Sequence, residues 1–122
     1  MRQPRAYLIL SMLCTILLLA SCGQRYEAKG VVKAFVEANA TDAKQLEITS
    51  FGKLDSTRII SDSIIHELRN RKDPMFKSGI TYPEYHKGEK LLFIRMRYRQ
   101  DGEEHSKTFY LDEHLTGVVA YK

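Results

Sequence analysis

The sequence predicts an α+β domain in which two helices pack on a curled antiparallel sheet of about four strands. Two observations carry this prediction. Apolar residues recur at helical spacing in two separate segments, and the last third of the chain alternates apolar and polar residues on both sides of a tight-turn dipeptide. Helices combined with consecutive antiparallel strands are typical of an α+β fold, and we expect both helices on one side of the sheet.

The first helix is expected between Tyr26 and Asn39. Its apolar positions fall at i, i+3, i+4 and i+7, which places them on one helical face: Ala28, Val31, Val32 and Phe35. Gly30 lies inside the segment and disfavours a helix by about 1 kcal/mol relative to Ala. Asn39 is a typical residue at a helix end.

A strand and a second helix are expected in the middle of the chain. Residues 46–49 alternate apolar and polar, which predicts a half-buried strand that continues through Leu54 to a turn at Asp55-Ser56. The cluster Ser61-Asp62-Ser63 is rich in helix-capping residues. The apolar residues that follow this cluster predict a helix, which Asp73-Pro74 ends.

The clearest local prediction is a β-hairpin formed by the segments LLFIRMRYRQ and EEHSKTFYLD. They are joined by Asp101-Gly102, a favoured dipeptide of two-residue hairpin turns. This turn fixes the cross-strand pairs, which are expected to be Ile94–Phe109 and Leu92–Leu111 on one face and Arg99–Glu104, Arg97–Ser106, Arg95–Thr108 and Phe93–Tyr110 on the other. A last strand, Val118 to Tyr121, is expected after a turn at Leu115-Thr116-Gly117.

The amino terminus has the pattern of a secretory signal peptide. Two arginines, Arg2 and Arg5, precede an apolar run of 15 residues from Ala6 to Ala20. As a helix this run would reach about 22 Å. That length is short of the roughly 30 Å of a bilayer's hydrocarbon core. A charged start, a short apolar middle and small residues at the end indicate a signal peptide.

The end of this run, Leu19-Ala20-Ser21-Cys22, resembles the lipobox of bacterial lipoproteins, in which an apolar residue and two small ones precede an obligatory cysteine. The resemblance implies that Cys22 receives a diacylglyceryl group and that the chain is cut just before it. An ordinary cleaved signal or an uncleaved anchor is the alternative. An ordinary signal leaves Cys22 unexplained, and an anchor must tolerate a marginal length.

The lipobox resemblance implies an organisation and a location. A cleaved signal peptide is expected over residues 1–21, a lipidated cysteine with a short tether over residues 22–25, and a single α+β domain over residues 26–122. Membrane lipid is then a partner through the acylated Cys22, because more than one acyl chain gives stable anchoring. The expected location is the cell envelope, at the outer membrane and facing the periplasm.

The order of the elements resembles the cystatin-like and nuclear-transport-factor-like α+β superfolds. The lipobox, the segment YEAKGVVKAFVEAN and the terminal FYLDEHLTGVVAYK are also similar to small lipoproteins of gut-dwelling Gram-negative bacteria. This resemblance implies a fold and a location, and little about activity. The glycine-rich wedge and the Gln-x-Val-x-Gly loop of the cystatin protease inhibitors are absent from the sequence.

Charge and cysteine content narrow the classes of function. The chain carries 19 basic and 15 acidic residues, and without Arg2 and Arg5 the net charge falls from +4 to +2. A charge this small gives no argument for binding nucleic acid. Cys14 leaves with the signal and Cys22 is the lipid site, so the mature domain has no cysteine for a disulfide, thiol chemistry or zinc.

The most strongly patterned candidate site is the set Arg95, Arg97 and Arg99. Arginines two apart on a strand point the same way and can grip carboxylates or phosphates in bidentate fashion. An acidic protein surface or a lipid headgroup would suit them. The alternative is a solvated sheet face, with Glu104 offsetting Arg99 across the hairpin.

A second candidate is the expected loop over residues 77–89, which contains Tyr82 and Tyr85. Exposed tyrosines are favoured at interfaces because they combine apolar area with a polar tip. If both are exposed, they mark a partner site. If they pack on the body of the domain, they belong to the core.

Other chemistry has weaker support in the sequence. None of the four histidines shows paired metal-ligand spacing, so no metal or cofactor is expected. Tyr98, Tyr110 and Asp112 could be imagined as the acid–base groups of a ketosteroid-isomerase-like pocket, but they match no motif, and we expect no enzyme. Ser56 and Ser63 each follow an aspartate in a pattern similar to an O-glycosylation acceptor, with a turn and a helix cap as equally good interpretations.

The sequence therefore predicts a lipid-anchored, exported accessory module that binds a protein or other partner at the cell envelope. The alternative is a small-molecule-binding or enzymatic pocket inside the curled sheet. A deep apolar pocket lined by convergent polar groups would favour that alternative. A filled core with an exposed arginine face would favour docking.

Overall fold

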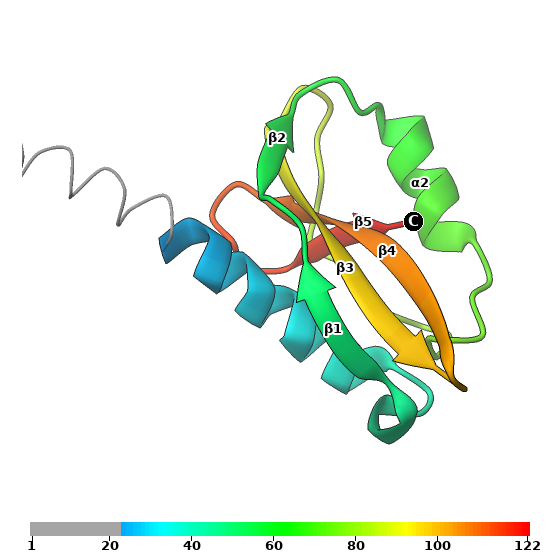
Figure 1. Cartoon of the computed structure of the whole chain (residues 1–122). Coiled ribbons are helices and arrows are strands. Elements are labelled where there is room, and N and C mark those ends of the chain that lie inside the picture. The colour runs from blue at the N-terminus through cyan, green and yellow to red at the C-terminus, as the bar shows by residue number, and fades with distance from the viewer. Residues whose placement is uncertain (1–22) are drawn as a thin grey trace, which may run out of the picture.

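The computed structural model describes residues 23–122 and shows an α+β fold, with two helices packed on a curled antiparallel sheet of five strands (Figure 1). The elements follow in chain order: a first helix (residues 23–39), a short 3-10 helix η1 (Ala43–Gln45), β1 (Glu47–Phe51), β2 (Asp55–Thr57), α2 (Asp62–Asn70), β3 (Leu91–Gln100), β4 (Glu103–Asp112) and β5 (Val118–Tyr121). The strand order is β1-β3-β4-β5, with β2 pairing to β3 on the same edge as β1. The predicted fold class is confirmed.

The hairpin of β3 and β4 forms in the predicted register. All six expected cross-strand pairs are present, from Leu92 opposite Leu111 to Arg99 opposite Glu104. Asp101 and Gly102 both adopt positive φ, 54° and 77°, which is the backbone of a two-residue turn matched to strand twist. The dipeptide therefore fixes a ladder of ten pairs.

The first helix closes one face of the sheet. Its buried residues recur at helical spacing, Ala28, Val32 and Val36, and they pack against the inward side chains of β3, β4 and β5. The largest fully buried side chains on this face are Phe109, Ile94, Met96 and Leu111. Within the described residues, no buried residue is polar or charged. The main core is therefore apolar and filled.

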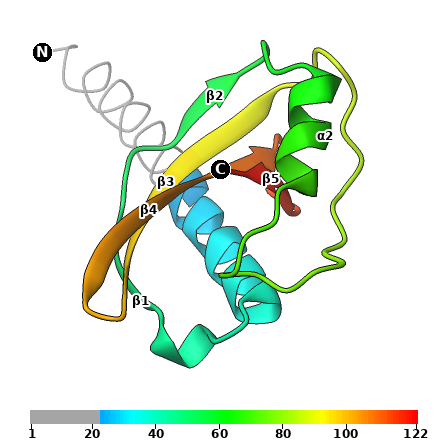
Figure 2. The ribbon, with the colours of Figure 1, turned by 90° about the vertical axis from the view of Figure 1, so that its right-hand side faces the viewer.

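Helix α2 packs on the other face, which corrects the expectation that both helices share one side. Its Ile65 and Leu68 join a second apolar cluster with Leu91 and Tyr110, whose side chains point away from the first helix. Figures 1 and 2 show the two helices on either side of the β3–β4 ribbon. The physical reason is that the outward side of β3 begins with apolar residues that also need cover.

Two expected boundaries are wrong. The segment Asp55-Ser56, expected as a turn, lies in strand β2 and pairs with Phe93 and Leu92. Helix α2 ends at Asn70 rather than at Asp73-Pro74, because Arg71 already has an extended backbone (ψ 135°). Its start agrees with the capping prediction, since the hydroxyl of Ser61 accepts a hydrogen bond from the Ile64 amide.

The lengths of α2 and β3 decide which surface stays open. Helix α2 has nine residues and is about 14 Å long. Strand β3 has ten residues and is about 33 Å long. Helix α2 covers the outer face of β3 only at the Leu91–Phe93 end. The other half of that outer face is therefore exposed.

Candidate functional site

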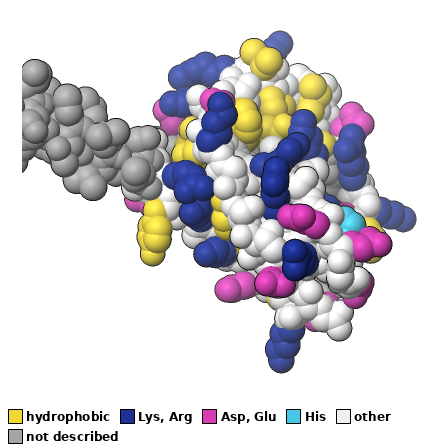
Figure 3. Space-filling view, viewed as in Figure 1, with side chains coloured by type: hydrophobic (Ala, Val, Ile, Leu, Met, Phe, Trp, Pro, Cys, Tyr) yellow, Lys and Arg dark blue, Asp and Glu magenta, His cyan; other side chains and the backbone are white. Residues whose placement is uncertain are grey.

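The exposed half of this outer face carries the arginine stripe, by which we mean Arg95, Arg97 and Arg99. All three side chains are exposed, and the residues that alternate with them, Met96 and Tyr98, are buried on the opposite face. Strand β3 is held between β4 on one side and β1 and β2 on the other. The stripe therefore sits on the central strand of the sheet, which is a rigid platform. Figure 3 shows Lys and Arg side chains running across the middle of this view, with Asp and Glu side chains around them.

The guanidinium groups of the stripe have no carboxylate partner among residues 23–122. Glu104 and Glu47 lie directly across from Arg99 on the two neighbouring strands. Even so, no ion pair within 4.0 Å forms between these glutamates and the stripe in the described part of the chain. Arg95 and Arg97 have only Gly52, Ser50, Thr108 and Ser106 as cross-strand neighbours. The positive charge is therefore least offset at Arg95 and Arg97.

Two other arginines are used within the fold and make a useful contrast. Arg25 donates to the carbonyls of Phe51 and Gly52 at 2.9 and 3.1 Å, beside edge strand β1. Arg69 donates to the carbonyls of Val119 and Pro83 at 2.9 and 2.6 Å, beside edge strand β5. These contacts join segments that are far apart in sequence, so no local pattern could have predicted them.

Tyr82 and Tyr85 are both half-buried and attach their loop to the body of the domain. The ring of Tyr82 lies 6.2 Å from that of Phe35, and the guanidinium of Arg69 stacks over it at 5.0 Å. The hydroxyl of Tyr85 donates to the carbonyl of Ile60. Burial raises the pKa of both phenols above the usual value. Neither tyrosine contacts the arginine stripe, and of the two expected outcomes packing is the one observed.

The residues imagined as catalytic do not come together. Tyr98 faces the first helix and Tyr110 faces α2, so they lie on opposite sides of the sheet. The carboxylate of Asp112 accepts hydrogen bonds from the Thr116 and Gly117 amides and from the Thr116 hydroxyl. Asp112 therefore holds the turn before β5, in which Leu115 has a φ of 57°.

The predicted lipidation site, Cys22, and the signal peptide over residues 1–21 lie outside the described residues. Gly23, Gln24 and Arg25, expected as a tether, belong to the first helix. From residue 23 onward, no helix is long and apolar enough to cross a membrane. Ser56 lies exposed in β2, and Ser63 is exposed in the first turn of α2.

Comparison with known proteins adds no assignment to this geometry. No family model, no curated protein and no solved structure matches the chain. The likeness to cystatin-like folds and to small bacterial lipoproteins remains a resemblance in sequence pattern. The site must therefore be interpreted from its own residues.

Proposed function

We propose that this protein is a lipid-anchored, exported accessory module that binds an acidic partner protein at the cell envelope through the arginine stripe. One observation carries the proposal: three guanidinium groups are exposed in a row on a rigid strand, without a carboxylate partner among the described residues. Arginine forms bidentate contacts with carboxylates, and such contacts give geometric specificity as well as affinity.

The position of the stripe restricts how a partner can bind. Because β3 has strands on both sides, a partner cannot add a strand to it and must lie across the face. The three side chains are spaced about 7 Å apart, twice the rise per residue of a strand. Lys122, whose backbone pairs with Thr108 at 2.9 and 3.0 Å, extends the positive face beyond β4. A flat surface with carboxylates at a similar spacing would be complementary.

The proposed anchor would leave this face accessible. The lipobox resemblance places the lipid on Cys22, next to the start of the first helix. Figure 1 shows that start and the tip of the β3–β4 hairpin at opposite ends of the molecule. With its acyl chains in the outer membrane, the domain would hold Arg99 farthest from the lipid and facing the periplasm.

The alternative of a pocket or enzyme site inside the sheet has less support. The side of the sheet that would enclose a pocket is filled by the first helix, and the residues buried there are apolar. A groove of about 730 Å³ does lie beside the first helix, but it is open to solvent and is lined by that helix and by the segments around residues 81–83 and 115–118. No set of convergent polar groups of the kind that orients a substrate lines the described interior.

The test is cross-linking and co-purification from intact cells. Wild type is compared with the variant Arg95→Glu/Arg97→Glu/Arg99→Glu and with the control variant Lys44→Glu/Arg58→Glu/Lys87→Glu. The control changes the net charge equally at exposed positions elsewhere. Folding is checked by circular dichroism, and anchoring by retention in the membrane fraction.

We expect wild type and the control to capture the same protein and the stripe variant to lose it. Retention of that protein by the stripe variant, or its equal loss in the control, would show that the stripe is not the docking surface. Capture of nothing by wild type would count against docking as a whole. A triple Arg→Gln variant separates loss of attraction from the repulsion that glutamate introduces.

A further inference from the structure

A cavity of about 430 Å³ lies between the end of α2, the loop that follows it and β5. Its volume falls in the range of small-molecule sites in proteins. Two kinds of side chain dominate its lining: the cations Arg69, Arg71, Lys72 and Lys77, and the aromatic rings of Phe76, Tyr82 and Tyr121. It lies outside the curled sheet and is separate from the arginine stripe.

Arg69 is the central cation of this cavity. Its Nε and one Nη donate to the Val119 and Pro83 carbonyls, which uses two of the five N–H groups of a guanidinium. The side chain is half-buried, and within residues 23–122 no carboxylate lies close enough to pair with it. Desolvation lowers the pKa of Arg69. A fixed, half-buried cation with free donors is suited to an anion.

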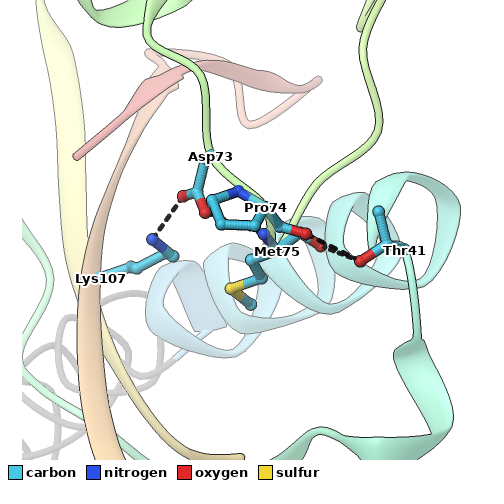
Figure 4. A network of polar contacts seen from close by, with 5 residues as sticks. All are labelled: Thr41, Asp73, Pro74, Met75 and Lys107. Carbon is cyan, nitrogen blue, oxygen red and sulfur yellow. Dashed lines mark hydrogen bonds and ion pairs between the residues drawn. The ribbon is translucent and has the colours of Figure 1, made fainter.

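The charge of the lining is positive even after its internal pairs are taken into account. Asp73 is its one carboxylate, and the Nζ of Lys107 neutralises it at 2.6 Å. Figure 4 shows this pair, together with the hydrogen bonds from the Thr41 hydroxyl that hold the following backbone at Pro74 and Met75. Arg71 lies 3.6 Å from Glu67, but both side chains are more than half exposed, so this pair is weak. Lys72 and Lys77 have no described carboxylate partner.

The aromatic wall adds an apolar surface with hydrogen-bond donors. The rings of Phe76 and Tyr121 lie 4.6 Å apart, and Tyr82 continues the wall beneath Arg69. Neither phenol of Tyr82 or Tyr121 forms a hydrogen bond within the described residues, and both line the cavity. Burial raises the pKa of each phenol, so both keep their protons and can donate near neutral pH.

We propose that this cavity binds a small molecule that joins a carboxylate or phosphate group to a planar apolar body. The oxyanion accepts hydrogen bonds from the free N–H groups of Arg69, and Lys72 and Lys77 add attraction at the rim. The planar body lies along the aromatic wall, beside the face of Tyr82 that Arg69 covers. This site is independent of the docking function proposed for the stripe.

The test uses the full-length chain, uniformly labelled with ¹⁵N and purified in detergent micelles. Phenyl phosphate and benzoate serve as probes, because they share a ring and differ in the oxyanion, and inorganic phosphate serves as the probe without a ring. Each is titrated to about 10 mM, a concentration that would nearly saturate even a site with a Kd of about 1 mM. Amide shifts identify the residues affected.

We expect saturable amide shifts at Arg69, Lys77 and Tyr82 with at least one ringed probe. Whichever of phenyl phosphate and benzoate binds with the lower Kd identifies the preferred oxyanion. The variant Lys72→Gln/Lys77→Gln should bind it about three- to tenfold more weakly, since exposed charges at the rim contribute modestly to affinity. The control Lys44→Gln/Lys87→Gln removes the same charge elsewhere and should leave the affinity unchanged.

Three results would overturn the proposal. The first is the absence of saturable shifts at the cavity with either ringed probe. The second is equal weakening in the control, which would indicate general charge attraction. The third is equal affinity for inorganic phosphate and phenyl phosphate, which would show that the aromatic wall makes no contact. Because Lys72 and Lys77 are exposed and hold no other element, their variant should remain folded.

Discussion

The two faces of the β3–β4 ribbon differ in how far their apolar residues extend and in how far a helix covers them. The inner face is apolar along most of β3 and along the half of β4 that ends at Asp112, with Ile94 and Met96 on β3 and Phe109 and Leu111 on β4 fully buried. The outer face is apolar only where β3 begins, and from Arg95 onward it is charged and exposed. Each face is covered by one helix, and the extent of cover follows the extent of its apolar residues.

This difference shows how a small domain can keep a charged, exposed surface without weakening its core. The first helix packs along the inner face, and the short α2 covers only the apolar end of the outer face. No apolar residue of the stripe's half is left to bury, so no element is required to cover it. The comparison predicts that substitutions on the inner face affect folding and that substitutions in the stripe affect binding.

The largest effect is expected from Phe109→Ala on the inner face. Phe109 is fully buried, and its ring lies 5.9 Å from those of Phe35 and Tyr121. Truncation of a buried Phe costs about 3–5 kcal/mol, which is a large part of a typical domain's stability. Urea unfolding followed by circular dichroism measures the loss.

The matched change on the outer face is Phe93→Ala, which truncates a half-buried ring in the smaller cluster. It should lower the free energy of unfolding by less than half as much. Equal costs would remove the distinction between the faces.

A smaller effect is expected from Lys107→Met, at the end of the inner face where apolar packing stops. Lys107 pairs with Asp73 at 2.6 Å, and the two side chains are only 16% and 19% exposed. The variant leaves a largely buried carboxylate with the Met75 amide as its remaining donor. The free energy of unfolding should fall by about 1.5–3 kcal/mol, the range for hydrogen bonds to charged groups.

A double-mutant cycle with Asp73→Asn separates the pair from its surroundings. The double variant should recover part of the loss, because no unpaired carboxylate remains. Arg71→Met serves as the exposed comparison, since its pair with Glu67 should change stability by less than about 0.5 kcal/mol. If Lys107→Met costs no more than Arg71→Met, the pair to Asp73 behaves as a surface pair and does not hold the loop.

Local sequence signals predicted the parts of the fold that depend on near neighbours. The Asp101-Gly102 turn fixed the whole register of the hairpin, and the Ser61 cap marked the start of α2. Strand β2 was missed because Asp55 and Ser56 have low strand propensity, and because their partners on β3, Phe93 and Leu92, lie 38 and 36 positions later in the sequence. The sidedness of α2 was missed for the same reason. The side on which α2 packs depends on the apolar residues Leu91 and Phe93 of β3. The sequence alone does not show whether a helix covers these residues or whether they face solvent.

The two candidate sites also differ in whether local sequence signals could predict them. The arginine stripe was predictable because strand alternation alone places Arg95, Arg97 and Arg99 on one side. The cavity beside Arg69 was not predictable, since its cations come from the last turn of α2 and the loop after it, and its rings come from that loop and from β5. Tyr82 was a candidate interface residue with core packing as the alternative, and the sequence did not show that Arg69 would stack on it.

The smallest effect on stability is expected from Arg95→Gln/Arg97→Gln/Arg99→Gln. The three side chains are exposed and make no ion pair in the described structure, so each change should alter the free energy of unfolding by less than about 0.5 kcal/mol. Measured by urea unfolding at low and high salt, the variant should match wild type, or become slightly more stable as repulsion among like charges is removed. A loss above about 1.5 kcal/mol would mean that the stripe supports the sheet. A neutral result would mean that the three aligned cations have no role in folding, which is the outcome that the proposed docking function requires.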